Sequence, residues 1–277
     1  MMINMPTSSK NKPVIIGFPF DDNSSYMKGA ALAPPLIREA LYSKSSNLWS
    51  ETGIDLKQES ILTDAGDLKF SSDSNSFDEI EKSITKLLNG YFIPVSLGGD
   101  HSITYPIIKA FNKKYPEIHI LHLDAHPDLY NELEGNRDSH ACPFARIMEN
   151  GLAKRITQVG IRTINGQQKK QAEKFGVEVI DMISWKDSMP LEFKAPVYIS
   201  IDIDVLDPAF APGVSHYEPG GLSTRQLITC IQNVSAPKII GADIVEFNPK
   251  RDESGITAMV CAKILKETIA KIVSLSG

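Results

Sequence analysis

A segment at residues 118–128 carries the side chains with the clearest capacity for chemistry. Its apolar run ends in Asp124, His126 and Asp128, alternate residues that an extended chain would place on one side. Buried carboxylates are costly unless they are paired or bind a metal. Two carboxylates and an imidazole brought together would repel and desolvate one another, and a divalent cation is the simplest remedy. The segment therefore predicts part of a metal site.

Two other segments repeat this arrangement. The run 197–208 contains Asp202 and Asp204, again two residues apart, after an apolar stretch. His101 follows Leu-Gly-Gly-Asp, where a predicted strand passes through a glycine turn into a helix. Each cluster alone has an ordinary interpretation, because Asp-x-His pairs form hydrogen bonds in loops and the two aspartates could cap a helix or lie in solvent. Three such clusters at three strand ends favour one shared site.

The combined set of side chains indicates the kind of metal. Two histidines and four carboxylates without a thiolate suit a hard to borderline ion, with manganese preferred over zinc or copper and with cobalt or nickel also compatible. Six ligands are too many for one ion with an open position, but they suit two ions that share bridging carboxylates. Such a pair of ions can hold a hydroxide, so the chemistry predicts a two-metal hydrolase.

The elements that must position these residues alternate along the chain. Short apolar runs typical of buried strands occupy residues 14–18, 91–97, 118–124, 156–161, 177–180, 197–203 and 239–244, with a weaker candidate at 61–64. Helical patterns occupy residues 34–43, 102–114, 140–150, 166–175 and 254–274, and two more begin at the capping-box pairs Ser76 with Glu79 and Ser223 with Gln226.

This alternation predicts an α/β fold, a three-layer α/β/α sandwich around a central, mostly parallel sheet. In open sheets of this kind, ligands bind beyond the carboxyl ends of the strands, where the three clusters fall. We interpret residues 1–12 as a flexible tail and residues 13–277 as a single domain, because no linker interrupts the pattern.

Composition narrows the partners and the compartment. The net charge of −5 argues against nucleic acid as a partner, and no apolar run is long enough to cross a membrane. Cys142, Cys230 and Cys261 are widely spaced, which indicates buried thiols rather than disulfides or a zinc site. The first twelve residues lack the apolar core of a signal peptide, so we predict a cytoplasmic protein, with a very short organellar leader as the alternative.

Four sequence blocks together resemble the ureohydrolase family, which includes arginases, agmatinases, guanidinobutyrases and formimidoylglutamases. The blocks are Gly-Gly-Asp-His, Asp-Ala-His-Pro-Asp, Ser-Ile-Asp-Ile-Asp-Val-Leu-Asp-Pro and Asp-Ile-Val-Glu-Phe-Asn-Pro, in this order from residue 98 to residue 249. The resemblance covers nearly the whole chain. It implies an arginase-like fold, release of urea and an amine from a linear guanidino compound, and assembly into homotrimers or homohexamers.

The resemblance also implies a role for each site residue. Two Mn²⁺ ions would be held by His101, Asp124, His126, Asp128, Asp202 and Asp204. Asp124 and Asp202 would bridge the ions, His101 and Asp128 would complete one site, and His126 and Asp204 the other. Asp128 would also orient the attacking hydroxide. His140 matches a proton-shuttling histidine, and Glu246 matches the carboxylate that grips the guanidinium.

The substrate is predicted less directly. The loop 208–221 and the run Ser-His-Ala-Cys-Pro are most similar to plant-type arginases, which favours arginine as substrate, cleaved to ornithine and urea. Agmatine, cleaved to putrescine and urea, is the alternative, followed by another guanidino acid or a formimidoyl compound. The residues expected to hold the far end of the substrate are Asn131, Asn136, Arg137 and Ser139. More remote alternatives are a single-metal deacylase and a non-catalytic binding subunit.

Three further histidines stay outside this assignment. His122 lies two residues before Asp124, where it is either a structural strand residue or a support for the metal ligands. His119 is expected to face the other way. His216 lies in a loop rich in glycine and proline that either borders the pocket or has a structural role.

Overall fold

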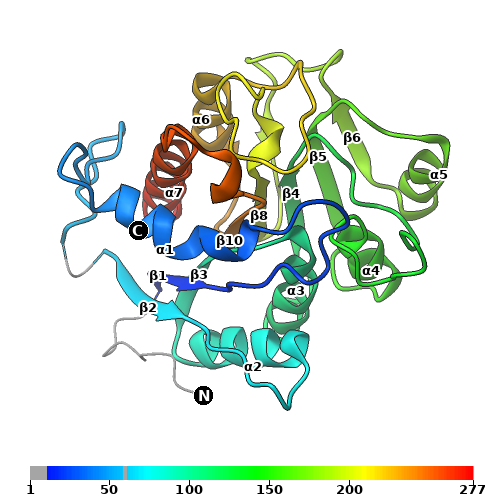
Figure 1. Cartoon of the computed structure of the whole chain (residues 1–277), viewed down its shortest axis with the longest axis horizontal. Coiled ribbons are helices and arrows are strands. Elements are labelled where there is room, and N and C mark those ends of the chain that lie inside the picture. The colour runs from blue at the N-terminus through cyan, green and yellow to red at the C-terminus, as the bar shows by residue number, and fades with distance from the viewer. Residues whose placement is uncertain (1–10, 59–60, 277) are drawn as a thin grey trace.

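The computed structural model describes residues 11–58 and 61–276, and among them eight strands form one sheet (Figure 1). Every neighbouring pair of these strands is parallel. The strands are β1 (Lys12–Gly17), β2 (Thr63–Asp67), β3 (Phe92–Leu97), β4 (His119–Leu123), β5 (Arg155–Ile161), β6 (Glu178–Asp181), β8 (Val197–Asp202) and β10 (Ile239–Val245). The short strands β7 (Leu191–Glu192) and β9 (Val234–Ser235), which the sequence did not predict, pair separately.

Helices cover both faces of the sheet. One face carries α1 (Ala33–Leu41), α6 (Thr224–Gln232) and α7 (Ile256–Ser274). The other carries α2 (Ser76–Asn89), α3 (Thr104–Asn112), α4 (Pro143–Glu149) and α5 (Gly166–Phe175). The predicted three-layer α/β/α sandwich is therefore confirmed.

Burial on both faces explains why the strands read as continuous apolar runs. In β1, Ile15 packs with the α1 and α7 side chains, whereas Val14 and Ile16 pack with those of α2 and α3. All six residues of β3 are buried, because successive side chains point to opposite covered faces.

The strand order places the functional segments next to one another. The order in the sheet is β2-β1-β3-β10-β8-β4-β5-β6, so the chain leaves β3 and resumes three positions away at β4. Strands β8 and β10 later fill the space between them. The carboxyl ends of β3, β10, β8 and β4 are therefore neighbours at the centre of the sheet, where ligands bind in folds of this kind.

Two predicted helices begin later than the sequence pattern indicated. The helix expected from residue 140 starts at Pro143, because proline lacks an N–H group and its fixed backbone angle suits the first turn. The helix expected from residue 102 is preceded by a separate 3-10 turn at His101–Ile103, after which α3 begins at Thr104. Both shifts leave a site residue, His140 or His101, outside the regular helix.

The two predicted capping boxes have opposite outcomes. Ser223 and Gln226 form the expected reciprocal pair at the start of α6, so that prediction is confirmed. The capping box predicted for Ser76 and Glu79 was wrong, because Asn75 caps α2 by accepting hydrogen bonds from the backbone of the first turn. Glu79 instead accepts from the backbone N–H of Ser71.

Two boundary predictions fall near the edges of the described residues. The weak strand predicted at 61–64 corresponds to β2, which begins at Thr63. The predicted tail at residues 1–12 lies outside the described residues except for its last two positions. Lys12 pairs with Phe92 and begins β1.

The corrected cap predicts a difference between two adjacent variants. Asn75→Ala removes the side chain that caps α2 and should lower the free energy of unfolding by about 1 kcal/mol. Ser76→Ala removes no capping bond and should change it far less. Chemical denaturation of both variants measures the difference, and an equal loss from both would contradict the cap assignment.

Candidate metal centre

The first side chain of the site comes from the turn after β3. Gly98, Gly99 and Asp100 carry the chain from Leu97 into the 3-10 helix that begins at His101. A side chain at Gly99 would have its Cβ 1.7 Å from the carbonyl oxygen of Phe20, so only glycine allows these backbones to approach. His101 is fully buried below this turn.

The second group of side chains follows β4, but the reason predicted for their convergence was wrong. Strand β4 ends at Leu123, so Asp124, His126 and Asp128 do not alternate along an extended strand. The Asp124 carboxylate accepts a hydrogen bond from the His126 backbone at 2.5 Å, and this closes a turn. Asp128 has a φ of 50°, which folds the chain back toward the site.

The third group lies at the end of β8. Asp202 is the last residue of the strand, and Asp204 lies in the 3-10 helix Ile203–Val205. The Asp202 carboxylate accepts from the Asp204 backbone N–H at 2.8 Å, so Asp202 caps this helix and also faces the site. Asp202 can therefore cap the 3-10 helix and contribute to the site at the same time.

Three carboxylates surround one nitrogen of His101. Its Nδ1 atom lies 3.2 Å from Asp124 Oδ2, 3.1 Å from Asp128 Oδ2 and 3.3 Å from Asp202 Oδ2. None of these distances is accompanied by a hydrogen bond to Nδ1, which is buried without a partner. The arrangement places a nitrogen and three oxygens around a common point.

The other nitrogen of His101 shows which atom carries the ring hydrogen. Ser200 Oγ donates to Asp243 Oδ1 at 2.7 Å, because a carboxylate only accepts. The same hydroxyl lies 2.9 Å from His101 Nε2 and therefore accepts from the Nε2–H group. The Nδ1 lone pair then points at three carboxylates, and a cation is the group that such a set of donors fits.

A second nitrogen completes the cluster. His126 Nδ1 lies 3.0 Å from Asp204 Oδ2 and 3.5 Å from Asp124 Oδ1. Asp124 is thus shared between the two histidines, through one oxygen each. The six residues predicted as metal ligands therefore lie in one cluster, in which Asp124, His126 and Asp204 are near enough to hold one ion. Their division between two ions stays a prediction.

The electrostatics of the cluster reflect the crowding of its charges. Burial raises the pKa of Asp202 well above its usual range, and the Asp204 and Asp124 carboxylates raise it further. Burial alone would lower the pKa of His101, but contacts with its carboxylate neighbours outweigh this and raise it. The pKa of His126 is raised in the same way, mainly by Asp204. Each of these three shifts favours the protonated form of the side chain. A bound cation would supply the positive charge in place of the protons.

Glu246 and His140 lie beside the cluster. Glu246 follows β10 with a φ of 64°, and its Oε1 accepts from the His101 backbone N–H at 2.9 Å. The same oxygen lies 2.8 Å from His140 Nδ1, while His140 Nε2 lies 2.8 Å from the Ser25 hydroxyl. Burial opposes a charge on His140, but Glu246 raises the pKa of the imidazole to about 9.

A cavity opens above these residues. Its inner wall consists of His126, Asp128, His140, Asp202, Asp204 and Glu246. Its outer wall consists of Ser25, Tyr130, Leu133, Ala141, Thr163, Gln168 and His216. His216 therefore borders the pocket, with its ring centre 5.2 Å from that of His140.

The four residues predicted to hold the far end of the substrate do not line this cavity. Arg137 is paired with Glu149 and with Asn131, and Asn136 bonds to Asp138 and Asn23. Ser139 is buried beside the backbone of Ala141. Their closeness in sequence to Asp128 did not show which way the side chains turn.

The outer wall instead includes residues that the sequence analysis did not select. Tyr130 lies two residues after Asp128, Thr163 lies two residues after the end of β5, and Gln168 lies in the first turn of α5. The sequence carried no direct signal for Thr163 or Gln168, which reach the cavity because β5 lies beside β4 and neighbouring parallel strands end at the same edge of the sheet.

The remaining histidines of β4 have different surroundings. His122 is fully buried, with Nε2 2.7 Å from Asp124 Oδ2. His119 lies at the start of the strand near Phe193, away from the cluster.

Comparison with known proteins shows the family of this chain. A model of the "Arginase family" matches residues 11–270. "Arginase 1, mitochondrial" of Arabidopsis thaliana is 45% identical over 98% of this chain and 84% of its own length. A solved structure of arginase from Medicago truncatula superposes with a TM-score of 0.90 at 42% identity, covering 95% of this chain and 87% of that one. The agmatinase of Bacillus cereus is 35% identical over 95% of this chain and 93% of its own length.

The fold and the site define a hydrolase with an α/β/α fold and a cluster of histidines and aspartates that could hold metal. The chain belongs to the arginase family and is a ureohydrolase, similar to plant-type arginases. None of the helices in the described residues is long and apolar enough to cross a membrane.

The predicted cytoplasmic location was wrong. The similar arginases of Arabidopsis and rice are named mitochondrial, and a second Arabidopsis arginase is named chloroplastic/mitochondrial, which points to an organelle. The prediction relied on the lack of a secretory apolar core, and that feature does not distinguish the cytoplasm from an organelle.

The crowded carboxylates predict that a bound cation stabilises the protein more as the pH rises. The pKa of Asp202 is higher in the folded protein than in the unfolded chain. The contribution of such a group to stability is fully present below the unfolded pKa and is lost as the pH rises through the folded pKa. Metal binding needs deprotonated ligands, so it strengthens over the same range. Manganese in excess should raise the melting temperature by about 5–10 °C at pH 8.

Calorimetry of manganese-loaded and chelator-treated protein at pH 8 and pH 5 measures this effect. The difference between the two forms should be clearly smaller at pH 5. An equal difference at both pH values would contradict the assignment of the cluster to a metal.

Proposed function

We propose that this chain hydrolyses arginine to ornithine and urea in the cavity above the carboxylate cluster. The observation that carries the proposal is the position of Glu246, a buried carboxylate on the wall of a cavity whose floor is the histidine and aspartate cluster. The 45% identity to a plant arginase over 98% of the chain supports arginine over agmatine.

We further propose that two Mn²⁺ ions are the resident metals. His101 and Asp128 would hold one ion, and His126 and Asp204 would hold the other. Asp124 and Asp202 would bridge the two ions. The donors are imidazole and carboxylate without thiolate, which suits manganese, although cobalt or nickel would also fit. When bound, such a pair lowers the pKa of water and stabilises negative charge that develops during hydrolysis.

Glu246 is suited to hold the guanidinium group. Burial raises the pKa of its carboxyl, but the charge and hydrogen bond of His140 lower it more, so the net shift favours the ionised form. A carboxylate and a guanidinium form strong charge-assisted hydrogen bonds. An arriving guanidinium can replace His140 as the partner of Glu246 and present its carbon to the cluster.

His140 and Asp128 are suited to manage protons and water. Asp128 lines the cavity and can accept a hydrogen bond from the attacking water, which orients its lone pair toward the guanidinium carbon. The departing amine needs a proton, which His140 can supply from the cavity wall. Its Nε2 atom contacts Ser25 on an exposed loop, so His140 can exchange protons with solvent through that hydroxyl.

The outer wall must recognise the amino-acid end of the substrate with neutral groups. The described residues that line the cavity include no lysine or arginine. Gln168 Oε1 accepts from the Asn165 backbone, which leaves the amide nitrogen of Gln168 as a donor. Together with the Tyr130 and Thr163 hydroxyls, it can hold an α-carboxylate without an ion pair. By family resemblance, we also propose that the chain forms homotrimers or homohexamers.

A substrate panel tests the proposed reaction. Metal-stripped protein reloaded with manganese should release urea from arginine faster than from agmatine, guanidinobutyrate or free guanidine. Asp124→Ala should abolish the release, because it removes the carboxylate shared by both histidines. Rapid turnover of agmatine without turnover of arginine would reverse the substrate assignment, and silence across the panel would overturn urea release itself.

Replacing Glu246 tests the guanidinium contact. Glu246→Gln keeps the shape but loses the negative charge, so kcat/KM for arginine should fall about 10- to 100-fold, as expected for loss of a hydrogen bond to a charged group. Glu132→Gln is the matched control, because Glu132 is an exposed acidic residue outside the cavity lining. Steady-state kinetics of both variants decide the role, and equal effects would argue against it.

A further inference from the structure

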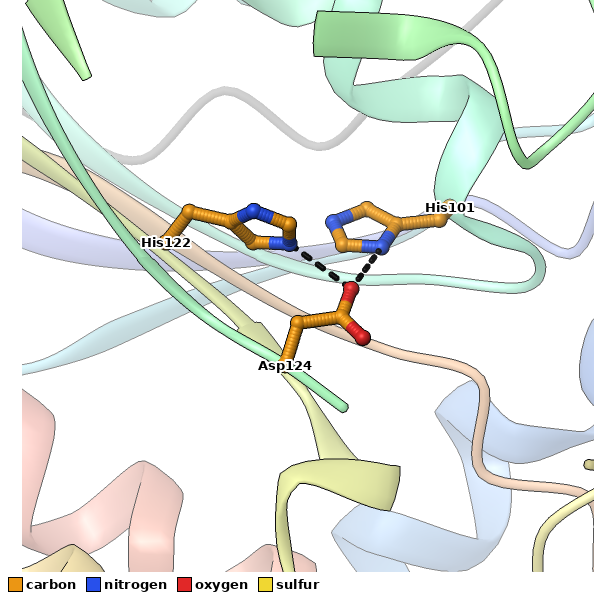
Figure 2. A group of neighbouring side chains, drawn as sticks. All are labelled: His101, His122 and Asp124. Carbon is orange, nitrogen blue, oxygen red and sulfur yellow. Dashed lines mark hydrogen bonds and ion pairs between the residues drawn. The ribbon is translucent and has the colours of Figure 1, made fainter. Parts of the chain in front are cut away.

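His122 is a fully buried histidine to which the proposed reaction assigns no role. It lies in β4, and its ring stacks on Phe144 with the ring centres 3.8 Å apart. Figure 2 shows His122 and His101 pointing from different elements at the same oxygen of Asp124. The distances to this Oδ2 atom are 2.7 Å from His122 Nε2 and 3.2 Å from His101 Nδ1.

The hydrogen bonds of Gln158 fix where the His122 ring carries its hydrogen. The Gln158 side-chain nitrogen lies 2.6 Å from the Pro127 carbonyl oxygen, which can only accept, so the amide nitrogen must face it. The same nitrogen lies 3.0 Å from His122 Nδ1 and donates its second hydrogen there. Nδ1 is therefore the acceptor, and the ring hydrogen lies on Nε2.

This arrangement makes His122 a donor to Asp124 rather than a metal ligand. His122, His101 and Asp124 lie near enough to one another to suggest an ion among them. However, the Nδ1 lone pair of His122 is used by Gln158, and its Nε2–H group points at Asp124. Neither nitrogen has a free lone pair, whereas His101 Nδ1 has one and no hydrogen-bond partner.

We propose that His122 is a positioning residue that fixes the Asp124 carboxylate for metal binding, and that Gln158 in turn fixes His122. The proposal rests on the proposed metal role of Asp124. One carboxylate oxygen is held by the His126 backbone N–H at 2.5 Å and the other by His122 at 2.7 Å. Each oxygen keeps a lone pair for a cation, and the carboxylate cannot rotate away from the position between His101 and His126.

Gln158 also connects this support to the ligand turn. Its contact with the Pro127 carbonyl ties β5 to the segment between His126 and Asp128. The Gln158 side-chain oxygen is buried without a hydrogen-bond partner, which is costly for an amide. The two hydrogen bonds of the Gln158 side-chain nitrogen, to His122 and to the turn, therefore fix the orientation of the amide.

Manganese affinity measured by isothermal titration calorimetry on the full-length, metal-stripped protein tests the proposal. His122→Phe keeps the stacked ring and removes the donor, so it should weaken manganese binding about 10- to 100-fold, the usual effect of losing a group that supports a metal ligand. His122→Gln can place an amide N–H near the Nε2 position and should restore most of the affinity. His119→Phe, on the same strand but away from the cluster, should bind as the wild type does.

The outcomes separate the alternatives. Wild-type affinity in His122→Phe overturns the proposal. Loss of one of the two bound ions in both His122→Phe and His122→Gln, counted by metal analysis, also overturns it and makes His122 a ligand. If His122→Phe does not fold, Gln158→Met decides, because it keeps the imidazole and should weaken binding in the same direction, whereas unchanged affinity there contradicts the proposal.

Binding and turnover are measured separately, so the proposal and the proposed function can fail independently. A wild-type protein that binds manganese but releases no urea would overturn the reaction and leave the positioning role testable by affinity. A wild-type protein that binds no manganese, cobalt or nickel would overturn both the metal role of Asp124 and the positioning role of His122.

Discussion

The site depends on one constraint, which is the burial of four carboxylates around two imidazole nitrogens. Asp124, Asp128, Asp202 and Asp204 are each at most 6% exposed, yet they meet at the ends of two adjacent strands. Like charges that are buried close together destabilise a fold unless protons or cations neutralise them. His101 Nδ1 faces three of these carboxylates and has no hydrogen-bond partner of its own.

Several of the predicted metal ligands are held by hydrogen bonds that leave other lone pairs of the same side chain free. Ser200 and Asp243 fix the His101 ring from behind, and the His126 backbone and His122 hold the two oxygens of Asp124. Asp204 accepts from the Ala125 backbone at 3.2 Å, which joins the turn after β4 to the turn after β8. Such supports pre-position the donors, so a cation would bind without the entropic cost of ordering them. In the proposed reaction, Glu246 and His140 would present the guanidinium group above these supported side chains.

The sequence predicted most of this arrangement because its strongest signals are local. Continuous apolar runs identified the long strands, since both faces of the sheet are covered. The aspartates and His126 stood out because charged or polar residues end these runs in pairs. The reason given for their convergence was nevertheless wrong, because a turn at Asp124 and a left-handed residue at Asp128, rather than an extended strand, bring them together.

Other features could not be predicted because they depend on tertiary contacts. Arg137 was a candidate for substrate binding, but Glu149, twelve residues away, pairs with it outside the cavity. Gln158 lies in β5 and carries no signal of function in the sequence, yet its two hydrogen bonds determine how His122 acts. The choice of Asn75 over Ser76 as a helix cap depended on where the backbone turns, which the residue types alone left open.

Anomalous diffraction at the manganese absorption edge, from crystals grown with manganese, tests the central claim most directly. The account predicts two peaks in each chain, one next to His101 Nδ1 and one next to His126 Nδ1, with Asp124 and Asp202 in contact with both. A single peak between His101, His122 and Asp124, or no peak in the carboxylate cluster, would contradict it.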